Sequence, residues 1–91
     1  YKEAIAEYKK AIELNPGYDS PHFNLGLLYF ERGKYKDAIN SFSGALEINP
    51  DFVKAHNYIG ESYMKIGDMK KALYHWKRSL VLDTKRWSNA M

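Results

Sequence analysis

Residues 25–50 read LGLLYFERGKYKDAINSFSGALEINP, and residues 59–84 read IGESYMKIGDMKKALYHWKRSLVLDT. The two segments start 34 residues apart and carry glycine, tyrosine and alanine at the same places. Residues 1–18 match residues 35–52 at eight identical positions, which extends the same period to the first residue of the sequence. A fixed period of this length is typical of proteins built from stacked structural repeats.

Within each copy the spacing of apolar residues is helical, because they recur every three to four positions. Gly33 and Gly67 each follow such a run and can take the left-handed conformation that ends a helix. Ser20 before Pro21 predicts a helix N-cap followed by proline in the first turn, and Pro50 cannot continue the helix before it. Short links should pair neighbouring helices as antiparallel hairpins. We therefore expect five helices, at 1–14, 20–32, 35–48, 53–66 and 69–84.

Small and large residues recur at fixed places in these helices. Gly26 and Gly60 lie inside helices, where glycine costs about 1 kcal/mol relative to alanine, so close packing must compensate for that cost. Large side chains at other repeated positions should fill the space between hairpins, namely Tyr29, Tyr63, Phe42 and Trp76. No single hairpin can bury such a stripe alone, so neighbouring hairpins must stack on one another.

The pattern Leu-Gly-x-x-Tyr from Leu25, followed by Ala38-x-x-x-Phe42 and Pro50, is similar to the tetratricopeptide repeat (TPR) signature. The resemblance implies an all-α fold in which antiparallel helix hairpins stack as a right-handed superhelix, an α-solenoid. It divides the chain into the second helix of a truncated repeat, two complete repeats, and an extension or the start of a next repeat, at 1–18, 19–52, 53–86 and 87–91. The sequence departs from the signature where histidine replaces tryptophan, at His22 and His56, and where threonine replaces the closing proline, at Thr84. Without that proline the last helix could also continue through Trp87.

The resemblance also implies a concave groove lined by the first helix of each repeat, where the family binds peptides or partner helices. In helix 20–32 the groove side should be largely apolar and should carry Ser20, Phe23, Asn24, Leu27, Phe30 and Glu31. In helix 53–66 it should be mostly polar and should carry Lys54, Asn57, Tyr58, Glu61, Met64 and Lys65. We expect this groove to bind a protein or peptide.

Phe23, Leu27 and Phe30 are spaced four and three residues apart, so they should form a single ridge on the groove side. The hairpin core is already defined by other residues, and an exposed apolar ridge of this kind is typical of an interaction surface. The alternative is that the ridge packs on the first helix of a preceding repeat.

Two other functions remain open. Exposed stacking faces at the two ends would make the chain a self-assembling scaffold that forms homo-oligomers, through Ile5, Tyr8 and Ile12 at one end and Leu73, Leu80 and Leu82 at the other. The chain could instead be a targeting module of a larger multidomain enzyme whose catalytic part lies elsewhere.

A carboxylate clamp of the kind found in chaperone-binding TPR domains is disfavoured. Such a clamp grips a terminal carboxylate with lysine, asparagine and arginine. Asn24 and Lys54 match two of the positions, but Tyr58 stands where the resemblance requires arginine. Tyr58 also interrupts the asparagine ladder known from a sugar-transferring enzyme of this family.

Composition excludes several further classes of function. The chain has 91 residues and no cysteine, which rules out disulfides, a thiolate zinc site and a cysteine nucleophile. Its formal net charge is +3 with the two signs interleaved, so we expect no specific nucleic-acid partner. The sequence has neither an apolar run of about 20 residues nor a glycine-rich phosphate loop. We expect no membrane span, no enzymatic activity and no cofactor, and a cytoplasmic location.

The histidines and the basic C-terminal segment have simple structural interpretations. His22 and His56 should pack half-buried at equivalent places, and His75 should face solvent, so we expect no metal site. Basic residues outnumber acidic ones after Gly67 and should form a solvated helix face, made by Lys70, Lys71, Lys77, Arg78, Lys85 and Arg86.

Overall fold

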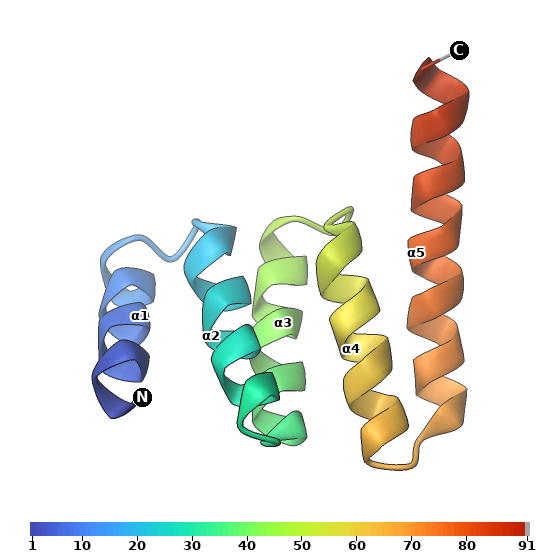
Figure 1. Ribbon diagram of the computed structural model, residues 1–91. Helices are drawn as coiled ribbons and strands as arrows, with labels where there is room; N and C mark the ends of the chain where they lie inside the picture. Colours follow the sequence, from blue (N-terminus) through green and yellow to red (C-terminus); the bar gives the residue numbers. More distant parts are fainter. Residues whose placement is uncertain (91) are drawn as a thin grey trace.

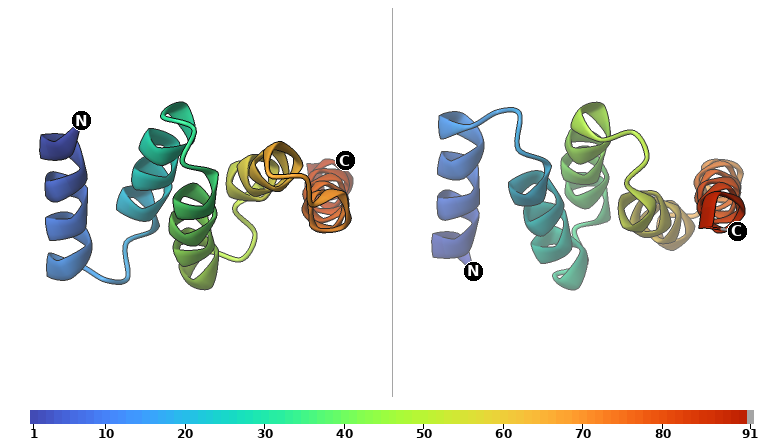
Figure 2. Two further views of the ribbon diagram at one scale, coloured as in Figure 1. Left: turned by 90° about the horizontal axis from the view of Figure 1, so that it is seen from below. Right: turned by 90° about the horizontal axis from the view of Figure 1, so that it is seen from above.

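The structure is a computed structural model that describes the backbone of residues 1–90 and the side chains of residues 1–84. Within these residues the chain forms helices and no strand, in the order α1 (Lys2–Leu14), α2 (Asp19–Glu31), α3 (Tyr35–Ile48), α4 (Val53–Lys65) and α5 (Met69–Ala90). The helices lie in a row in chain order, and each runs antiparallel to the one before it (Figures 1 and 2). The expected stack of antiparallel hairpins is therefore confirmed.

The links after α2 and α4 have the same hydrogen-bonding pattern. Gly33 and Gly67 adopt φ angles of 75° and 88°, in the left-handed region that favours glycine. After α2 the Lys34 N–H donates to the carbonyl of Tyr29 at 2.9 Å, and the Gly33 N–H donates to that of Phe30 at 3.0 Å. The equivalent bonds after α4 measure 2.8 and 3.0 Å. These paired bonds are the Schellman motif, which satisfies the last carbonyls of a helix.

Two predicted helix boundaries need correction. Helix α2 begins at Asp19 rather than at Pro21, and its N-cap is Tyr18 without a side-chain cap bond, so Ser20 is not the N-cap. Asp19 is favourable in the first turn, because a negative charge there interacts with the positive end of the helix dipole. Its carboxylate also accepts a hydrogen bond from Asn49 Nδ2 at 3.2 Å. Helix α5 continues past Thr84 to Ala90, because threonine, unlike proline, keeps its backbone N–H.

The hydrophobic core lies where α2, α3 and α4 meet. Its centre consists of Ala38, Phe42 and Ile59, which are almost fully buried. The Phe42 ring lies directly against Gly26, so that a Cβ atom at that position would be 2.6 Å from two ring carbons. Around this centre pack partly buried side chains, namely Phe23, Leu27, Tyr29, Phe30, Leu46, Tyr58 and Tyr63.

The hairpin formed by α4 and α5 repeats this arrangement. A Cβ atom at Gly60 would lie 2.5 Å from Nε1 of Trp76, the residue equivalent to Phe42. Both helical glycines therefore make room for an aromatic ring of the partner helix, which accounts for their cost within a helix. Phe42 and Trp76 were expected between hairpins; both pack within their own hairpins against these glycines, and Phe42 also stacks on Tyr58 of the next hairpin.

Candidate functional site

The aromatic residues among the predicted groove residues of α2 are half-buried. Phe23 stacks on Phe52 with ring centroids 4.8 Å apart and lies 5.5 Å from Phe42. Phe30 meets Tyr58 edge to face at 5.3 Å, and Phe23 meets the same tyrosine at 5.9 Å. Such aromatic pairs stabilise the packing beyond the area that they bury. The expectation that the hairpin core does not need this ridge is wrong, because the ridge packs against the core within the same chain.

The other predicted groove residues of α2 are Ser20, Asn24 and Leu27, and all three are half-buried. Leu27 packs against the same core, whereas Glu31 at the end of the helix is exposed. Phe23, Leu27 and Phe30 thus pack against the same core, and Tyr58 of α4 covers one side of Phe23 and Phe30.

The predicted groove residues of α4 are mostly exposed. Only Tyr58 is half-buried, because its ring stacks on Phe42 at 5.5 Å. Asn57 is exposed, but its Oδ1 accepts a hydrogen bond from the Ser79 hydroxyl at 2.6 Å, so that oxygen is engaged with α5. The remaining members form an exposed polar face with one methionine, made by Lys54, Glu61, Met64 and Lys65.

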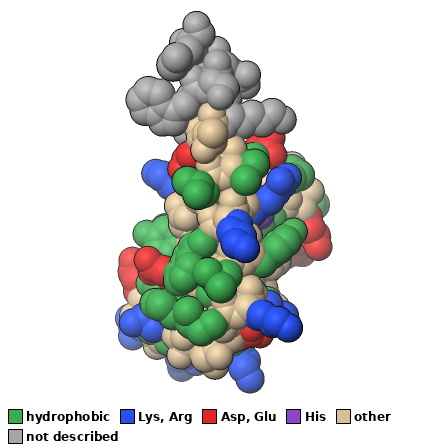
Figure 3. Space-filling view, turned by 90° about the vertical axis from the view of Figure 1, so that its right-hand side faces the viewer, with side chains coloured by type: hydrophobic (Ala, Val, Ile, Leu, Met, Phe, Trp, Pro, Cys, Tyr) green, Lys and Arg blue, Asp and Glu red, His purple; other side chains and the backbone are tan. Residues whose placement is uncertain are grey.

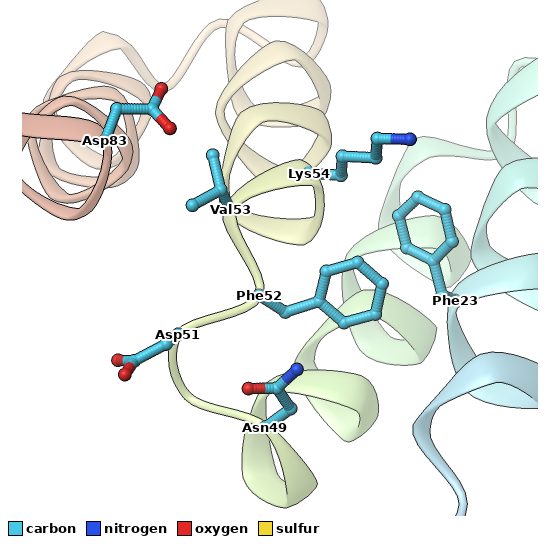
Figure 4. A pocket seen from close by; sticks show the side chains of 7 residues that line it. All are labelled: Phe23, Asn49, Asp51, Phe52, Val53, Lys54 and Asp83. Atoms are coloured by element: carbon cyan, nitrogen blue, oxygen red, sulfur yellow. The ribbon is translucent and has the colours of Figure 1, made fainter. Parts of the chain in front are cut away.

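An open hollow of about 530 Å³ lies where α2, the link before α4, and α5 approach one another. Figure 4 shows the Phe23 and Phe52 rings beside each other and Lys54 extending above them, with Asp51 and Asp83 on the other side of Phe52. Its full lining is Phe23, Asn49, Asp51, Phe52, Val53, Lys54 and Asp83. A hollow with apolar rings inside and charges at its rim can accept an apolar side chain and orient its polar neighbours.

Sequence reasoning missed two aromatic residues of this region. Phe52 stacks on Phe23, and Tyr35 meets Phe30 edge to face at 5.4 Å. A signal for Phe52 exists, since an aromatic residue stands at the same repeat position in Tyr18. The same signal exists for Tyr35, since Tyr1 stands at its position one repeat earlier, although the counterpart in the following repeat is methionine.

The histidines do not all lie where the sequence places them. His22 is half-buried over Gly44, as expected, and His56 is buried more deeply, with 6% of its surface exposed. His75 does not face solvent: it is half-buried, and its Nδ1 lies 3.1 Å from Nδ1 of His56. Burial, and secondly the neighbouring His56, lower the pKa of His75 below its usual value of 6.5.

The outer face of α5 has no helix over it. Leu73 and Leu80 are 49% and 66% exposed, whereas Ile39, which occupies the position of Leu73 in the preceding repeat, is 8% exposed beneath its neighbours. Figure 3 shows apolar side chains gathered on this side of the molecule among lysines and arginines. At the other end, the predicted face of α1 is half-buried, at Ile5, Tyr8 and Ile12, as is Leu82 on α5.

The basic segment forms an exposed helix face over the part whose side chains the structure describes, up to residue 84. Lys70, Lys71, Lys77 and Arg78 are exposed, and Lys71 Nζ lies 3.9 Å from Asp68. Lys85 and Arg86 lie outside the residues whose side chains the structure describes. Within the described part of the chain, no group of three or more His, Asp or Glu residues is arranged to hold a metal ion. None of the described helices is both long enough and apolar enough to cross a membrane.

The TPR repeat family model matches residues 1–31 and 26–67, and the chain therefore belongs to the TPR family. Its structure is similar to a crystal structure of MamA, with 30% identity and a TM-score of 0.90 over 92% of this chain and 49% of that one. A second crystal structure of the MamA protein has 29% identity and a TM-score of 0.87, over 96% of this chain and 48% of that one. The structure of MamA MSR-1 has 34% identity and a TM-score of 0.88, over 94% of this chain and 49% of that one.

The chain thus spans about half the length of the MamA structures that it matches. A search of the curated proteins gives no match to this sequence. TPR repeats are scaffolds for interaction with other proteins and do not supply catalytic chemistry of their own. The family and the stacked hairpins therefore define the chain as a protein–protein interaction module.

Proposed function

We propose that this module binds a peptide or helix of a partner protein along the face made by α2 and α4, which we call the groove. The groove consists of the ridge of α2 and the exposed polar residues of α4. Its partner would place an apolar side chain against the aromatic rings and would align its charges with Lys54, Glu61 and Lys65. Apolar anchoring within a charged rim is the usual division of affinity and specificity at such interfaces.

The hollow beside Phe23, Phe52 and Lys54 is the observation that carries this proposal. It joins the ridge of α2 to the first turn of α4, so that an anchor seated there continues directly onto the polar face of α4. The rings that line it are already held by stacking at 4.8 Å. Little ordering of the protein is therefore needed on binding, which favours affinity.

A double charge swap on α4 tests the groove without disturbing the core. Lys54→Glu together with Glu61→Lys inverts the charge pattern of the groove, and both positions are exposed. A partner matched to the original pattern should then bind at least about tenfold more weakly, because like charges would be brought together. The measurement is the affinity, by biolayer interferometry, of a partner first captured by the original chain.

The matched control is a charge swap on α3, Lys36→Glu together with Glu47→Lys, which also leaves the net charge unchanged at exposed positions. This control should bind as the original chain does. Equal affinity for the original chain and the α4 swap, with helicity unchanged by circular dichroism, would show that the partner does not use the groove.

Self-assembly through the outer face of α5 is a second candidate, and it is favoured by the exposed Leu73 and Leu80. The equivalent face of α3 is covered by α4, so the α5 face is suited to a helix of the same type. A second copy of the chain, or a further repeat, would bury these leucines at a gain of about 1.5–3 kcal/mol for each one fully covered.

We expect Leu73→Glu together with Leu80→Glu to shift any oligomer to monomer in sedimentation velocity measurements across a concentration series. Two charges placed in an apolar contact would have to be desolvated for the oligomer to persist. Leu14→Glu, at a position 77% exposed on α1, is the control and should leave the association unchanged. A chain that stays monomeric at all concentrations would rule out this candidate.

A further inference from the structure

His56 and His75 form a bonded pair inside the α4–α5 hairpin. His56 lies in the first turn of α4 and is buried, and its Nε2 is 3.0 Å from the carbonyl oxygen of Pro50 in the preceding link. Its Nδ1 is 3.1 Å from Nδ1 of His75 on α5. The two contacts join the α3–α4 link, α4 and α5 through a single imidazole ring.

The contacts determine where the protons are in the neutral pair. A carbonyl oxygen only accepts, so His56 carries its proton on Nε2 and donates to Pro50. The other nitrogen of a neutral imidazole has a lone pair, so His56 Nδ1 accepts a hydrogen bond. The donor of that bond is His75 Nδ1–H, which leaves the lone pair of His75 on its Nε2.

Each proton added to the neutral pair makes this arrangement less favourable. A first proton on Nε2 of His75 keeps both hydrogen bonds but places a charge on a half-buried ring. A second proton on Nδ1 of His56 would point two N–H groups at each other across 3.1 Å and would set two cations side by side. The bond between the rings cannot survive that state, because neither nitrogen retains a lone pair.

The aromatic and basic groups around the pair carry no negative charge. On α4, Tyr63 stacks on His75 at 5.8 Å; on α5, Tyr74 meets His75 edge to face at 5.0 Å. Lys71 of α5 lies over the Tyr63 ring, with its Nζ 5.5 Å from the ring centroid. Arg78, three residues after His75 on α5, is exposed.

The carboxylates near the pair are engaged or face elsewhere. Asp51 follows Pro50 in the link, is exposed and lines the hollow, and Asp68 pairs with Lys71. Among the side chains that the structure describes, neither His56 nor His75 is within ion-pair distance of a carboxylate. Protonation of the pair therefore lacks an anionic partner that would offset its cost.

Only one of the two complete repeats has this pair. His22 is the repeat equivalent of His56, but Ser41 stands where His75 would be. The two equivalent hairpins thus differ in one titratable contact. Any pH sensitivity that arises from this contact is therefore confined to the α4–α5 hairpin.

We propose that the His56–His75 pair is a pH-sensitive latch, which holds α4, α5 and the Pro50 link together while it is neutral, weakens when it takes up a first proton and loses the bond between its rings when it takes up a second. His75 binds protons more readily in the unfolded chain, because its pKa is lowered on folding. The stabilisation by the latch is therefore complete above about pH 6.5 and declines as the pH falls below that value.

The tautomers are tested first, by long-range ¹H–¹⁵N NMR correlation of the histidine side chains at about pH 7.5. The expected result is a proton on Nε2 of His56 and on Nδ1 of His75. Protons on Nε2 of both rings would overturn the latch, because no hydrogen would then lie between the two Nδ1 atoms. This measurement uses the unaltered chain and so does not depend on the folding of a variant.

The pH dependence is tested with His75→Asn, whose amide nitrogen can donate in place of Nδ1 but does not titrate. Between about pH 7.5 and pH 5 the melting temperature of the original chain should fall by about 4–8 °C more than that of the variant. His22→Gln is the matched control and should keep the pH dependence of the original chain. Equal pH dependence in the original chain and His75→Asn would overturn the proposal.

Discussion

Replacement of Phe42 by alanine is expected to lower the free energy of unfolding by about 3–5 kcal/mol. Its ring is fully buried, touches Gly26 and contacts the aromatic rings of both α2 and α4. The neighbouring helices keep their other contacts, so they close the resulting cavity only in part. Because the total stability of a chain of this size is about 5–14 kcal/mol, this single change would remove a large part of it.

Urea unfolding followed by circular dichroism measures this loss. Tyr8 occupies the position equivalent to Phe42 one repeat earlier and is only half-buried, since α1 is covered on one side. Tyr8→Ala should therefore cost clearly less than Phe42→Ala. Similar losses for the two variants would contradict the placement of the core at α3.

The effect of Gly26→Ala on the free energy of unfolding is expected to change sign with the residue at position 42. In the original chain the added methyl group would meet the Phe42 ring at 2.6 Å, an overpacking cost of about 1–3 kcal/mol. The higher helix propensity of alanine returns about 1 kcal/mol of this. In the Phe42→Ala background the ring is absent, so the same methyl group should stabilise the chain and partly fill the cavity.

A double-mutant cycle measures this coupling, with all four chains unfolded by urea in a stabilising osmolyte so that the weakest remains folded at the start. We expect a coupling energy of about 2 kcal/mol between the two positions. Gly17→Ala, whose nearest neighbour would be Asn15 Oδ1 at 4.0 Å, is the control and should have almost the same effect in both backgrounds. Gly26→Ala stabilising both backgrounds equally would show that the glycine does not accommodate the ring.

The candidate site was partly predictable. The spacing of Phe23, Leu27 and Phe30 correctly places them on one side of α2, because side chains three and four residues apart on a helix are neighbours. That spacing does not show how much of the ridge is covered. Tyr58 and Phe52 come from the next repeat, and their rings reach back over α2 only once the hairpins have stacked.

His75 shows the same difference more sharply. Its neighbours in the sequence favour an exposed position, and its repeat equivalent is Ser41, so the period gives no sign of a partner. The partner, His56, is 19 residues away and belongs to the opposite helix of the hairpin. Such a contact depends on the rotation and offset of two helices, which their sequences do not specify separately.

The sequence by itself determined the period, the five helices, their antiparallel pairing and the left-handed glycines that end α2 and α4. These features follow from local preferences and from apolar spacing within one helix. Only the tertiary structure decided that an aromatic ring of the partner helix lies against each helical glycine, that the ridge of α2 is half-covered, and that two histidines 19 residues apart lie within hydrogen-bond distance. Each of these is a contact between helices, and its geometry is set by how closely the packed backbones can approach.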